Sequence, residues 1–478
     1  MNQPETASVI SSKSEVSSAE YFAQRQLKQG TVGWLLLIGL GVAYVISGDF
    51  AGWNFGIAQG GWGGMFIATA LAALMYLCLC LSMSEMSTMM PTAGGGYSFA
   101  RAAFGPFGGY LTGTAILIEY AIAPAAIAVF IGGYCESLFG INGWMIYLFC
   151  YAIFMGIHLK GAGEALKIMF AITLVAAIAL IVFIVAMIPH FNAQNLFDIP
   201  VGTSVGASLF LPHGYLGIWA AVPFAIWFFL AVEGVPLAAE EAKDPAKSLP
   251  RGLIGAMLIL TAFAMLILFL GAGAAGASTL QNSGAPLVDA LVKVYGTNTW
   301  LATFVNFVGL AGLIASFFSI IYAYSRQIFA LSRAGYLPTS LSLTNKNKAP
   351  YLAIIIPGII GFLLSLTKEG DSLILIAVFG ATISYVLILL SHIKLRLSKP
   401  DLPRPYKTPG GIVTSSIALV LAVAAVVAGF VVNPKVWFIA AAIYVVFIAY
   451  FLFYSRYHLV KGTPEEEFAN IKAAEQEL

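Results

Sequence analysis

The sequence predicts an all-α membrane protein, and its composition and its apolar windows carry that prediction. Of its 478 residues, 60% are hydrophobic and 10% are charged, whereas soluble proteins have about 45–50% apolar and about 25% charged residues. The mean hydropathy is +0.89. A water-soluble core cannot hide this much apolar surface, so a soluble enzyme, a disordered protein and a secreted disulfide scaffold are excluded. The net charge of +2 provides no basic field for nucleic acid.

Twelve low-charge windows are candidates for membrane spans, since a helix needs about 20 apolar residues to cross a bilayer. The first six windows lie near 32–58, 61–84, 107–135, 143–157, 166–188 and 216–236. The second six lie near 253–275, 300–325, 350–366, 372–392, 412–432 and 436–455.

The distribution of Lys and Arg predicts the orientation of these spans. If the N-terminus is cytoplasmic and the spans alternate, 21 of the 24 Lys and Arg residues lie on the cytoplasmic side. Cytoplasmic loops carry such an excess. Only Lys293, Lys368 and Lys435 lie outside. We therefore expect both termini in the cytoplasm.

Cysteine usage indicates neither a disulfide framework nor a metal site. Cys78, Cys80, Cys135 and Cys150 lie in or beside apolar runs without zinc-ligand spacing. We expect them to be small core residues, and we expect no metal and no cofactor. Residues 1–30 are polar, with no apolar stretch before Trp34, so no cleavable signal peptide is expected.

The first window is interrupted by polar and small residues. Ser47, Gly48, Asp49, Gly52 and Asn54 fall within eight positions. Glycine weakens helices, and Ser, Asp and Asn compete for backbone hydrogen bonds. An unwound segment is tolerated at membrane depth only where it lines a cavity or packs against protein. The alternative is a kinked packing helix.

The sixth window is interrupted in a similar way, by Pro223, by the Glu233-Gly234 pair and by Pro236. Interrupted segments at corresponding positions of two halves indicate a transporter binding site. The first and sixth windows are five apart, and because five is odd, two five-span halves must insert with opposite orientations. The pattern thus predicts an inverted repeat with broken first and sixth helices.

Three carboxylates lie inside apolar windows, where an ionisable group is costly and functional by default. They are Asp49, Glu119 and Glu233, and no Lys or Arg shares their windows. Unpaired carboxylates near one cavity would attract a cation, or one would hold a proton. The alternative is that Glu233 caps a half-helix and that Glu119 is neutral and hydrogen-bonded.

Aromatic residues gather near the same interruptions. Aromatic faces can hold a small ammonium group by cation–π attraction, although for any single ring core or lipid packing is an alternative. The aromatic candidates for a substrate site are Trp53, Tyr120, Trp227 and Phe229.

Three stretches at the ends of predicted spans resemble those of the amino acid–polyamine–organocation transporters. They are Glu-Met-Ser-Thr-Met-Met-Pro-Thr-Ala-Gly-Gly-Gly-Tyr (85–97), Glu-Gly-Val-Pro-Leu-Ala-Ala-Glu-Glu-Ala-Lys-Asp-Pro (233–245) and Ser-Arg-Gln-Ile-Phe-Ala-Leu-Ser-Arg-Ala-Gly-Tyr-Leu-Pro (325–338). The resemblance covers about residues 30–455. It implies a LeuT-like fold with two inverted five-span repeats and two C-terminal helices, and hence twelve transmembrane helices. The implied parts are a polar tail (1–30), repeat one (31–188), an extracellular loop (189–215), repeat two (216–396), the last two spans (397–455) and a second tail (456–478).

Within that superfamily, residues 44–56 and 60–64 resemble bacterial ethanolamine permeases. Amino acid permeases use a neutral break whose free N–H groups hold the substrate carboxylate. Here Asp49 stands in that position, where its carboxylate would repel an amino acid carboxylate and suit an ammonium. By the same resemblance Glu119 faces the substrate and Trp227 covers it.

The coupling ion is a separate question. Many relatives carry a fifth-span lysine in place of a sodium ion, and this chain has none there. Ser316 and Ser319 are either sodium ligands or helix-packing hydroxyls. Glu233 or Glu119 is our expected site for a coupling proton.

The sequence therefore predicts a secondary transporter of a bacterial inner membrane that imports ethanolamine by alternating access. The expected substrate site comprises Ser47, Gly48, Asp49, Trp53, Glu119, Tyr120, Trp227, Phe229 and Glu233. The alternative is a permease for a neutral amino acid or for another amine, such as choline or a polyamine. The expected partners are a small amine and the lipid bilayer, and the chain is a monomer or a homodimer. We find no His-Glu-x-x-His motif, and we expect no enzyme activity.

Overall fold

The computed structural model describes residues 30, 32–141, 143–297 and 299–460. The predicted polar tails, 1–30 and 456–478, lie almost entirely outside these residues. Within them the secondary structure is helical apart from two isolated β-bridges, Val32 with Ala242 and Thr344 with Pro350. The prediction of an all-α protein is therefore confirmed for the described chain.

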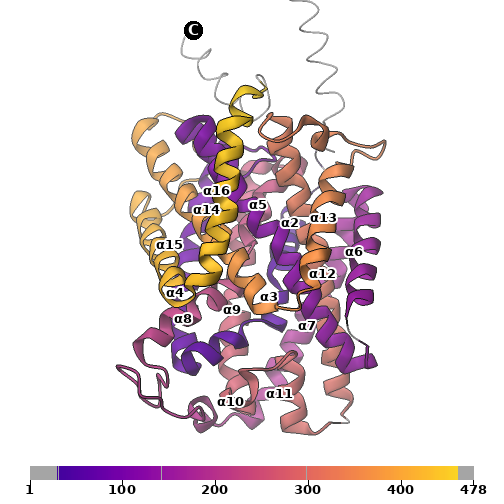
Figure 1. Ribbon diagram of the computed structural model, residues 1–478, viewed down its shortest axis with the longest axis vertical. Helices are drawn as coiled ribbons and strands as arrows, with labels where there is room; N and C mark the ends of the chain where they lie inside the picture. The colour runs from indigo at the N-terminus through magenta and orange to yellow at the C-terminus, as the bar shows by residue number, and fades with distance from the viewer. Residues whose placement is uncertain (1–29, 31, 142, 298, 461–478) are drawn as a thin grey trace, which may run out of the picture.

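The helices follow one another in long, mostly parallel or antiparallel rods (Figure 1). The first half contains α2 (Trp34–Val45), α3 (Ser47–Phe50), α4 (Asn54–Met89), α5 (Gly96–Phe139), α6 (Trp144–Leu159), α7 (Ala162–Met187), η1 (Ile188–His190) and η2 (Ala193–Phe197). Next come α8 (Gly214–Trp227), η3 (Val232–Glu241), α9 (Pro245–Ala275), α10 (Ala277–Leu280) and α11 (Pro286–Tyr295). The chain ends with α12 (Trp300–Arg333), η4 (Thr339–Ser342), α13 (Tyr351–Ser365), α14 (Gly370–Ser398), α15 (Ile412–Val432), α16 (Pro434–Phe453) and η5 (Ser455–Tyr457).

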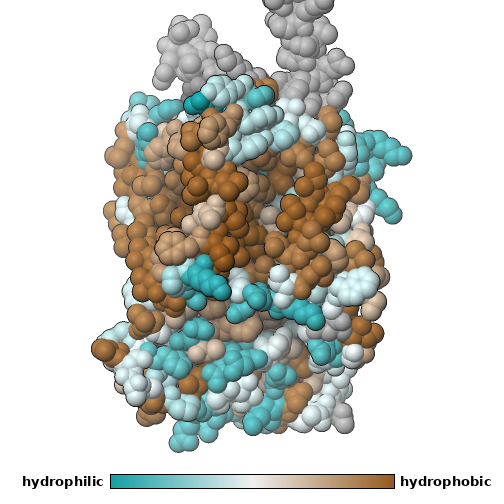
Figure 2. Space-filling model, in the orientation of Figure 1, coloured by the Kyte–Doolittle hydropathy of each residue, from teal (hydrophilic) through white to brown (hydrophobic). Residues whose placement is uncertain are grey.

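Nine helical segments of the described chain are long and apolar enough to cross a membrane. The shorter apolar helices α2, α6 and α13 coincide with the first, fourth and ninth predicted windows. A band of hydrophobic residues covers the middle of the visible face, with hydrophilic residues at both ends (Figure 2). The protein is thus a multi-pass membrane protein. The count of twelve crossings and the inverted repeat stay predictions.

The interruption in the first window lies within the predicted residues 47–54, but its first residues are helical. Ser47, Gly48 and Asp49 form the one-turn helix α3, and the chain turns after it through Ala51–Trp53. Gly52 has a φ of +97° there, a conformation that glycine adopts at little cost. The end of the first window, from Asn54 on, belongs to α4, which bends at Gly61 (φ +69°).

The interruption in the sixth window also differs from the prediction. Pro223 lies inside α8, and the chain leaves the helix only at Phe228. It resumes as the 3₁₀ helix η3 after Ala231, whose φ is +77°. A positive φ is strained for a residue with a side chain. Glu233 and Pro236 therefore lie after the break, within η3.

Close helix packing brings the candidate residues together. Helix α14 packs along α5, and α4 packs along α8 and α9. A Cβ atom at Gly380 of α14 would lie 2.5 Å from the carbonyl oxygen of Ala115 and 2.9 Å from the nitrogen of Glu119. Because only glycine permits this approach, α14 and α5 meet directly beside Glu119. The four cysteines are free and buried, as predicted.

Candidate substrate site

The two helix breaks meet in the centre of the molecule. A Cβ atom at Gly48 would lie 2.6 Å from the carbonyl oxygen of Trp227 and 3.3 Å from the Cα of Phe228. Real Cβ atoms essentially never come within 3.0 Å of a heavy atom, so this contact requires glycine. Two segments about 180 residues apart in the sequence are thereby held backbone to backbone.

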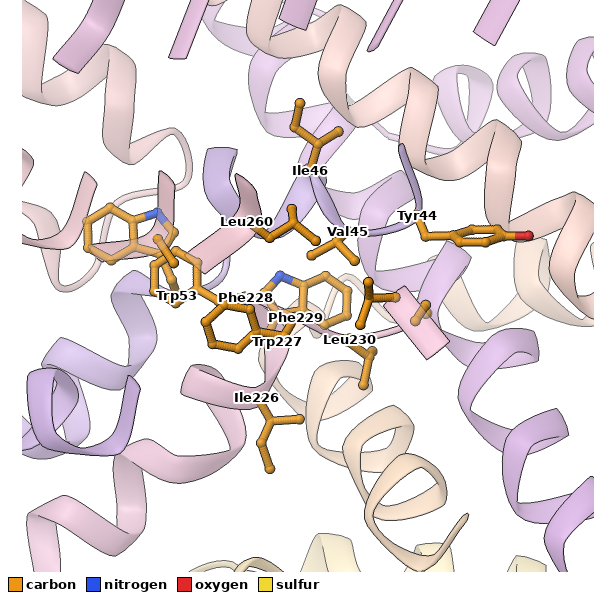
Figure 3. Packing of buried hydrophobic residues seen from close by; sticks show 14 of the residues in the cluster. Tyr44, Val45, Ile46, Trp53, Ile226, Trp227, Phe228, Phe229, Leu230 and Leu260 are labelled. Atoms are coloured by element: carbon orange, nitrogen blue, oxygen red, sulfur yellow. The ribbon is translucent and has the colours of Figure 1, made fainter. Parts of the chain in front are cut away.

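Aromatic side chains enclose this junction (Figure 3). Trp227 donates a hydrogen bond from its Nε1 to the Ala51 carbonyl oxygen at 3.0 Å. This bond links the end of α8 to the turn that follows α3. The Trp53 ring stacks on the Phe228 ring with centroids 5.7 Å apart. Trp227, Trp53 and Phe229 are all buried. They form an apolar and π-rich wall around the break, and their role in holding an ammonium group stays a prediction.

A small internal space lies between the two breaks. Its walls are Tyr44, Val45, Ser47, Trp227, Leu230 and Ile320. All six side chains are buried. The two breaks are therefore closely packed around this space.

Asp49 is the acidic group of α3. It is fully buried, and neither of its oxygens has a hydrogen-bond partner among the described residues. Its environment supplies burial and no charge interaction. A buried carboxylate without a partner is strongly unfavourable, so Asp49 is favourable at this position only as a neutral carboxyl group or beside a positive charge.

Glu119 and Glu233 form a pair apart from Asp49. Both are buried, they interact directly with each other, and the backbone N–H of Ala231 lies near both carboxyl groups. Neither carboxyl group makes a hydrogen bond of good geometry. The structure thus divides the three predicted acids into two positions, a pair and a single residue.

Tyrosines surround the carboxyl pair. Tyr120, a predicted site residue, places its hydroxyl 3.1 Å from where a Cβ at Gly234 would lie, and it interacts with both glutamates. Tyr385 of α14 lies beside Glu233, and its hydroxyl is 2.7 Å from that of Tyr76 in α4.

Sequence reasoning missed Tyr76 and Tyr385. Each is one tyrosine in an apolar window without a motif, so no sequence signal distinguishes it from a packing residue. Only the contacts of α4 and α14 around the carboxyl pair reveal it.

The serines proposed as sodium ligands link α12 to the first break. The Ser316 hydroxyl donates to the Tyr44 carbonyl oxygen at 2.6 Å and lies 2.8 Å from the Ser47 hydroxyl. Ser319 donates to the Ser316 carbonyl oxygen at 2.9 Å. These bonds suit the helix-packing alternative, and a sodium-ligand role stays a prediction.

Buried ion pairs close the end of the molecule where η3 finishes. Glu241 pairs with Arg326 of α12 at 2.8 Å and accepts a hydrogen bond from Tyr322. Glu240 pairs with Arg333 at 2.7 Å. The four residues of the two ion pairs come from two of the stretches that carry the family resemblance. They join the second half of the broken sixth segment to α12.

A third buried acid, Glu85, lies near the C-terminus of α4 and binds residues that follow α14 and lie at its end. Its oxygens accept hydrogen bonds from Arg396 at 2.5 and 2.9 Å and from Arg404 at 2.9 Å. The backbone N–H of Thr408 donates to it at 2.7 Å. Unlike Asp49, Glu119 and Glu233, the acids at this end are fully paired, which leaves the central three as the unusual group.

Two interrupted helical segments that meet inside a multi-pass apolar bundle, with buried carboxyl groups near them, are typical of a membrane transporter of small molecules. Comparison with known proteins agrees: the amino acid permease family matches residues 6–453. The chain belongs to the amino acid permease family.

Its relatives are distant in sequence but similar in length. An uncharacterised transporter of Rhizobium meliloti is 28% identical over 76% of this chain and 78% of its own. The branched-chain amino acid permease BcaP of Bacillus subtilis is 27% identical over 80% of this chain and 84% of its own. A methylthioribose transporter of Bacillus subtilis is 25% identical over 78% and 81%. The chain is thus a permease and not an enzyme.

Proposed function

We propose that this permease imports ethanolamine, a small primary ammonium compound, by alternating access with proton coupling. The observation that carries the proposal is Asp49, which is buried and unpaired beside the aromatic junction. Among the described residues, none of the three central carboxyl groups is paired with Lys or Arg, so a positive charge brought by a substrate would be favourable there. An ammonium group supplies it, and the rings of Trp53 and Trp227 favour it further by cation–π attraction.

The hydroxyl of ethanolamine also suits the broken segments. Residues between α8 and η3 leave the regular helix, so their backbone groups are available to a polar ligand. In this proposal Ser47, Gly48 and Asp49 form one wall with Trp53, and Trp227 and Phe229 form the opposite wall. Glu119, Tyr120 and Glu233 lie at the second acidic position.

The second candidate is a neutral amino acid, which the names of the branched-chain amino acid permeases among the relatives favour. The acids argue against it, since a substrate carboxylate brought near them would be repelled in a medium that screens charge weakly. Choline and polyamines remain alternatives on the same physical grounds, because each carries positive charge without a carboxylate.

The test is uptake of labelled ethanolamine by purified protein in liposomes, with unlabelled leucine, alanine, choline and putrescine as competitors. Asp49→Asn removes the negative charge at nearly constant volume, and uptake should fall at least about tenfold, the effect of about 1.4 kcal/mol. Glu119→Gln should lower it as well. Asp371→Asn, an exposed residue at the start of α14, is the control and should leave uptake unchanged.

Two outcomes contradict this proposal. If Asp49→Asn and Glu119→Gln both keep the uptake of the unaltered protein, the acidic pocket does not bind the ammonium. If leucine or alanine is transported and ethanolamine neither competes nor is taken up, the neutral amino acid alternative is correct. Separate proton and sodium gradients then identify the coupling ion.

We further propose the topology that the basic residues predict. The twelve apolar segments would each cross a bacterial inner membrane, and the end with the paired Glu240 and Glu241 would face the cytoplasm. The first and second five segments would form the inverted repeat, since α3 and the break after α8 meet at the centre.

A further inference from the structure

Two phenols and two carboxyl groups from four elements converge on one buried cluster. Tyr76 of α4 and Tyr385 of α14 are fully buried, their hydroxyls are 2.7 Å apart, and their rings meet edge to face at 5.2 Å. Tyr385 lies beside Glu233 of η3, which contacts Glu119 of α5.

The other groups that face the cluster carry no positive charge. Tyr44 of α2, Tyr120 of α5 and Cys80 of α4 interact with Glu233. The nearest cation is Arg326, which acts on Tyr44 and is itself paired with Glu241. Within the described chain, the two glutamates therefore have phenols and backbone N–H groups as neighbours, and no Lys or Arg.

The direction of the Tyr76–Tyr385 hydrogen bond decides whether Tyr385 has a hydrogen left for Glu233, since either hydroxyl could be the donor. Each phenol donates one hydrogen, and only one hydrogen occupies the short contact between Tyr76 and Tyr385. If Tyr76 donates to Tyr385, the Tyr385 hydrogen is free to donate to Glu233. In this direction Tyr76 donates to Tyr385, and Tyr385 donates to the Glu233 carboxylate. Successive hydrogen bonds of this kind strengthen one another.

We propose that Tyr385, with Tyr76 behind it, is a positioning residue for a single proton shared by Glu119 and Glu233. In the singly protonated pair, Glu119 holds the proton and Glu233 is the carboxylate that accepts from Tyr385. A second proton arriving on Glu233 removes that charge and weakens the bond from Tyr385. The amine then binds at the separate Asp49 position, so substrate and coupling proton do not compete for one carboxylate.

This inference rests on the proposed proton coupling, but its first test needs no substrate. The infrared C=O stretching band of buried protonated carboxyl groups is recorded against pH for the purified protein. Tyr385→Phe keeps the ring and removes the donor to the Glu233 carboxylate, so Glu233 should bind the second proton of the pair more tightly. The midpoint of the band's titration should move about 1 to 2 pH units higher, because a hydrogen bond to a charged group is replaced by none.

The matched variants separate a specific effect from a loss of packing. Tyr76→Phe removes the second donor and should shift the midpoint in the same direction by a smaller amount. Tyr324→Phe is the control: Tyr324 is equally buried, but its hydroxyl donates to the Ile354 carbonyl oxygen at 3.0 Å, and its loss should not move the midpoint. Glu233→Gln should remove the component of the titration that belongs to Glu233 and leave that of Glu119.

Transport measurements distinguish this inference from the proposed function. Tyr385→Phe should shift the pH profile of net uptake and leave exchange of labelled for unlabelled ethanolamine unchanged. An infrared shift without ethanolamine transport would contradict the proposed substrate and support the proposed role of Tyr385. Ethanolamine transport with no infrared shift in Tyr385→Phe or Tyr76→Phe would overturn the cluster alone.

Discussion

Single residues decide how closely the two breaks approach. Gly48 allows α3 to touch the Trp227 carbonyl oxygen, and Gly380 allows α14 to reach the backbone of Glu119. Neither glycine is needed for its own dihedral angles, since neither has a positive φ. The missing side chain is what the packing requires.

Gly48→Ala should therefore impair both folding stability and transport. The added Cβ would lie 2.6 Å from a backbone oxygen, which cannot rotate away, and overpacking of this kind costs about 1–3 kcal/mol. We expect a lower midpoint of thermal unfolding in detergent and little uptake. Gly156→Ala in α6 is the control, since nothing lies within 4 Å of its Cβ position. Equal thermal midpoints for the two variants would contradict the close contact.

Buried ion pairs join η3 to α12 at the end of η3. Their contribution to stability depends on both partners being present. Removing one partner of a buried pair leaves an uncompensated charge and costs about 3–5 kcal/mol, whereas replacing both can be nearly neutral. Glu241 and Arg326 are both almost fully buried. This pair fixes η3 to α12 independently of the substrate site.

Arg326→Gln should thus destabilise the protein strongly, and adding Glu241→Gln should recover most of the loss. Thermal unfolding of the single and double variants measures this coupling. The exposed pair of Lys247 and Asp244, 3.7 Å apart, provides the comparison, because exposed pairs contribute about 0–1 kcal/mol. If Arg326→Gln behaves like Lys247→Gln, the buried pair does not hold η3 in place.

At the scale of the whole molecule, the hydrophobic band and the two polar ends define a membrane orientation (Figure 2). The predicted topology puts Lys435, at the start of α16, outside and Lys247, at the start of α9, inside. Both side chains are exposed. The four native cysteines are buried, so they should react slowly with a thiol reagent that does not cross membranes.

Lys435→Cys should be labelled by such a reagent in intact cells, and Lys247→Cys only after the membrane is permeabilised. The unaltered protein supplies the background signal. Labelling of Lys247→Cys in intact cells, or protection of Lys435→Cys, would reverse the orientation or change the number of crossings between them.

The sequence by itself determined the class of the protein and the identity of the unusual residues. Continuous apolar windows require lipid as their solvent, and a carboxyl group inside such a window is recognisable without any structure, because its burial is so unfavourable. The tertiary structure decided which of those carboxyl groups meet. It placed Glu119 with Glu233 and two tyrosines, and it placed Asp49 apart from them, in α3. Those contacts join helices hundreds of residues apart, and they depend on glycine approaches and side-chain volumes that no local pattern encodes.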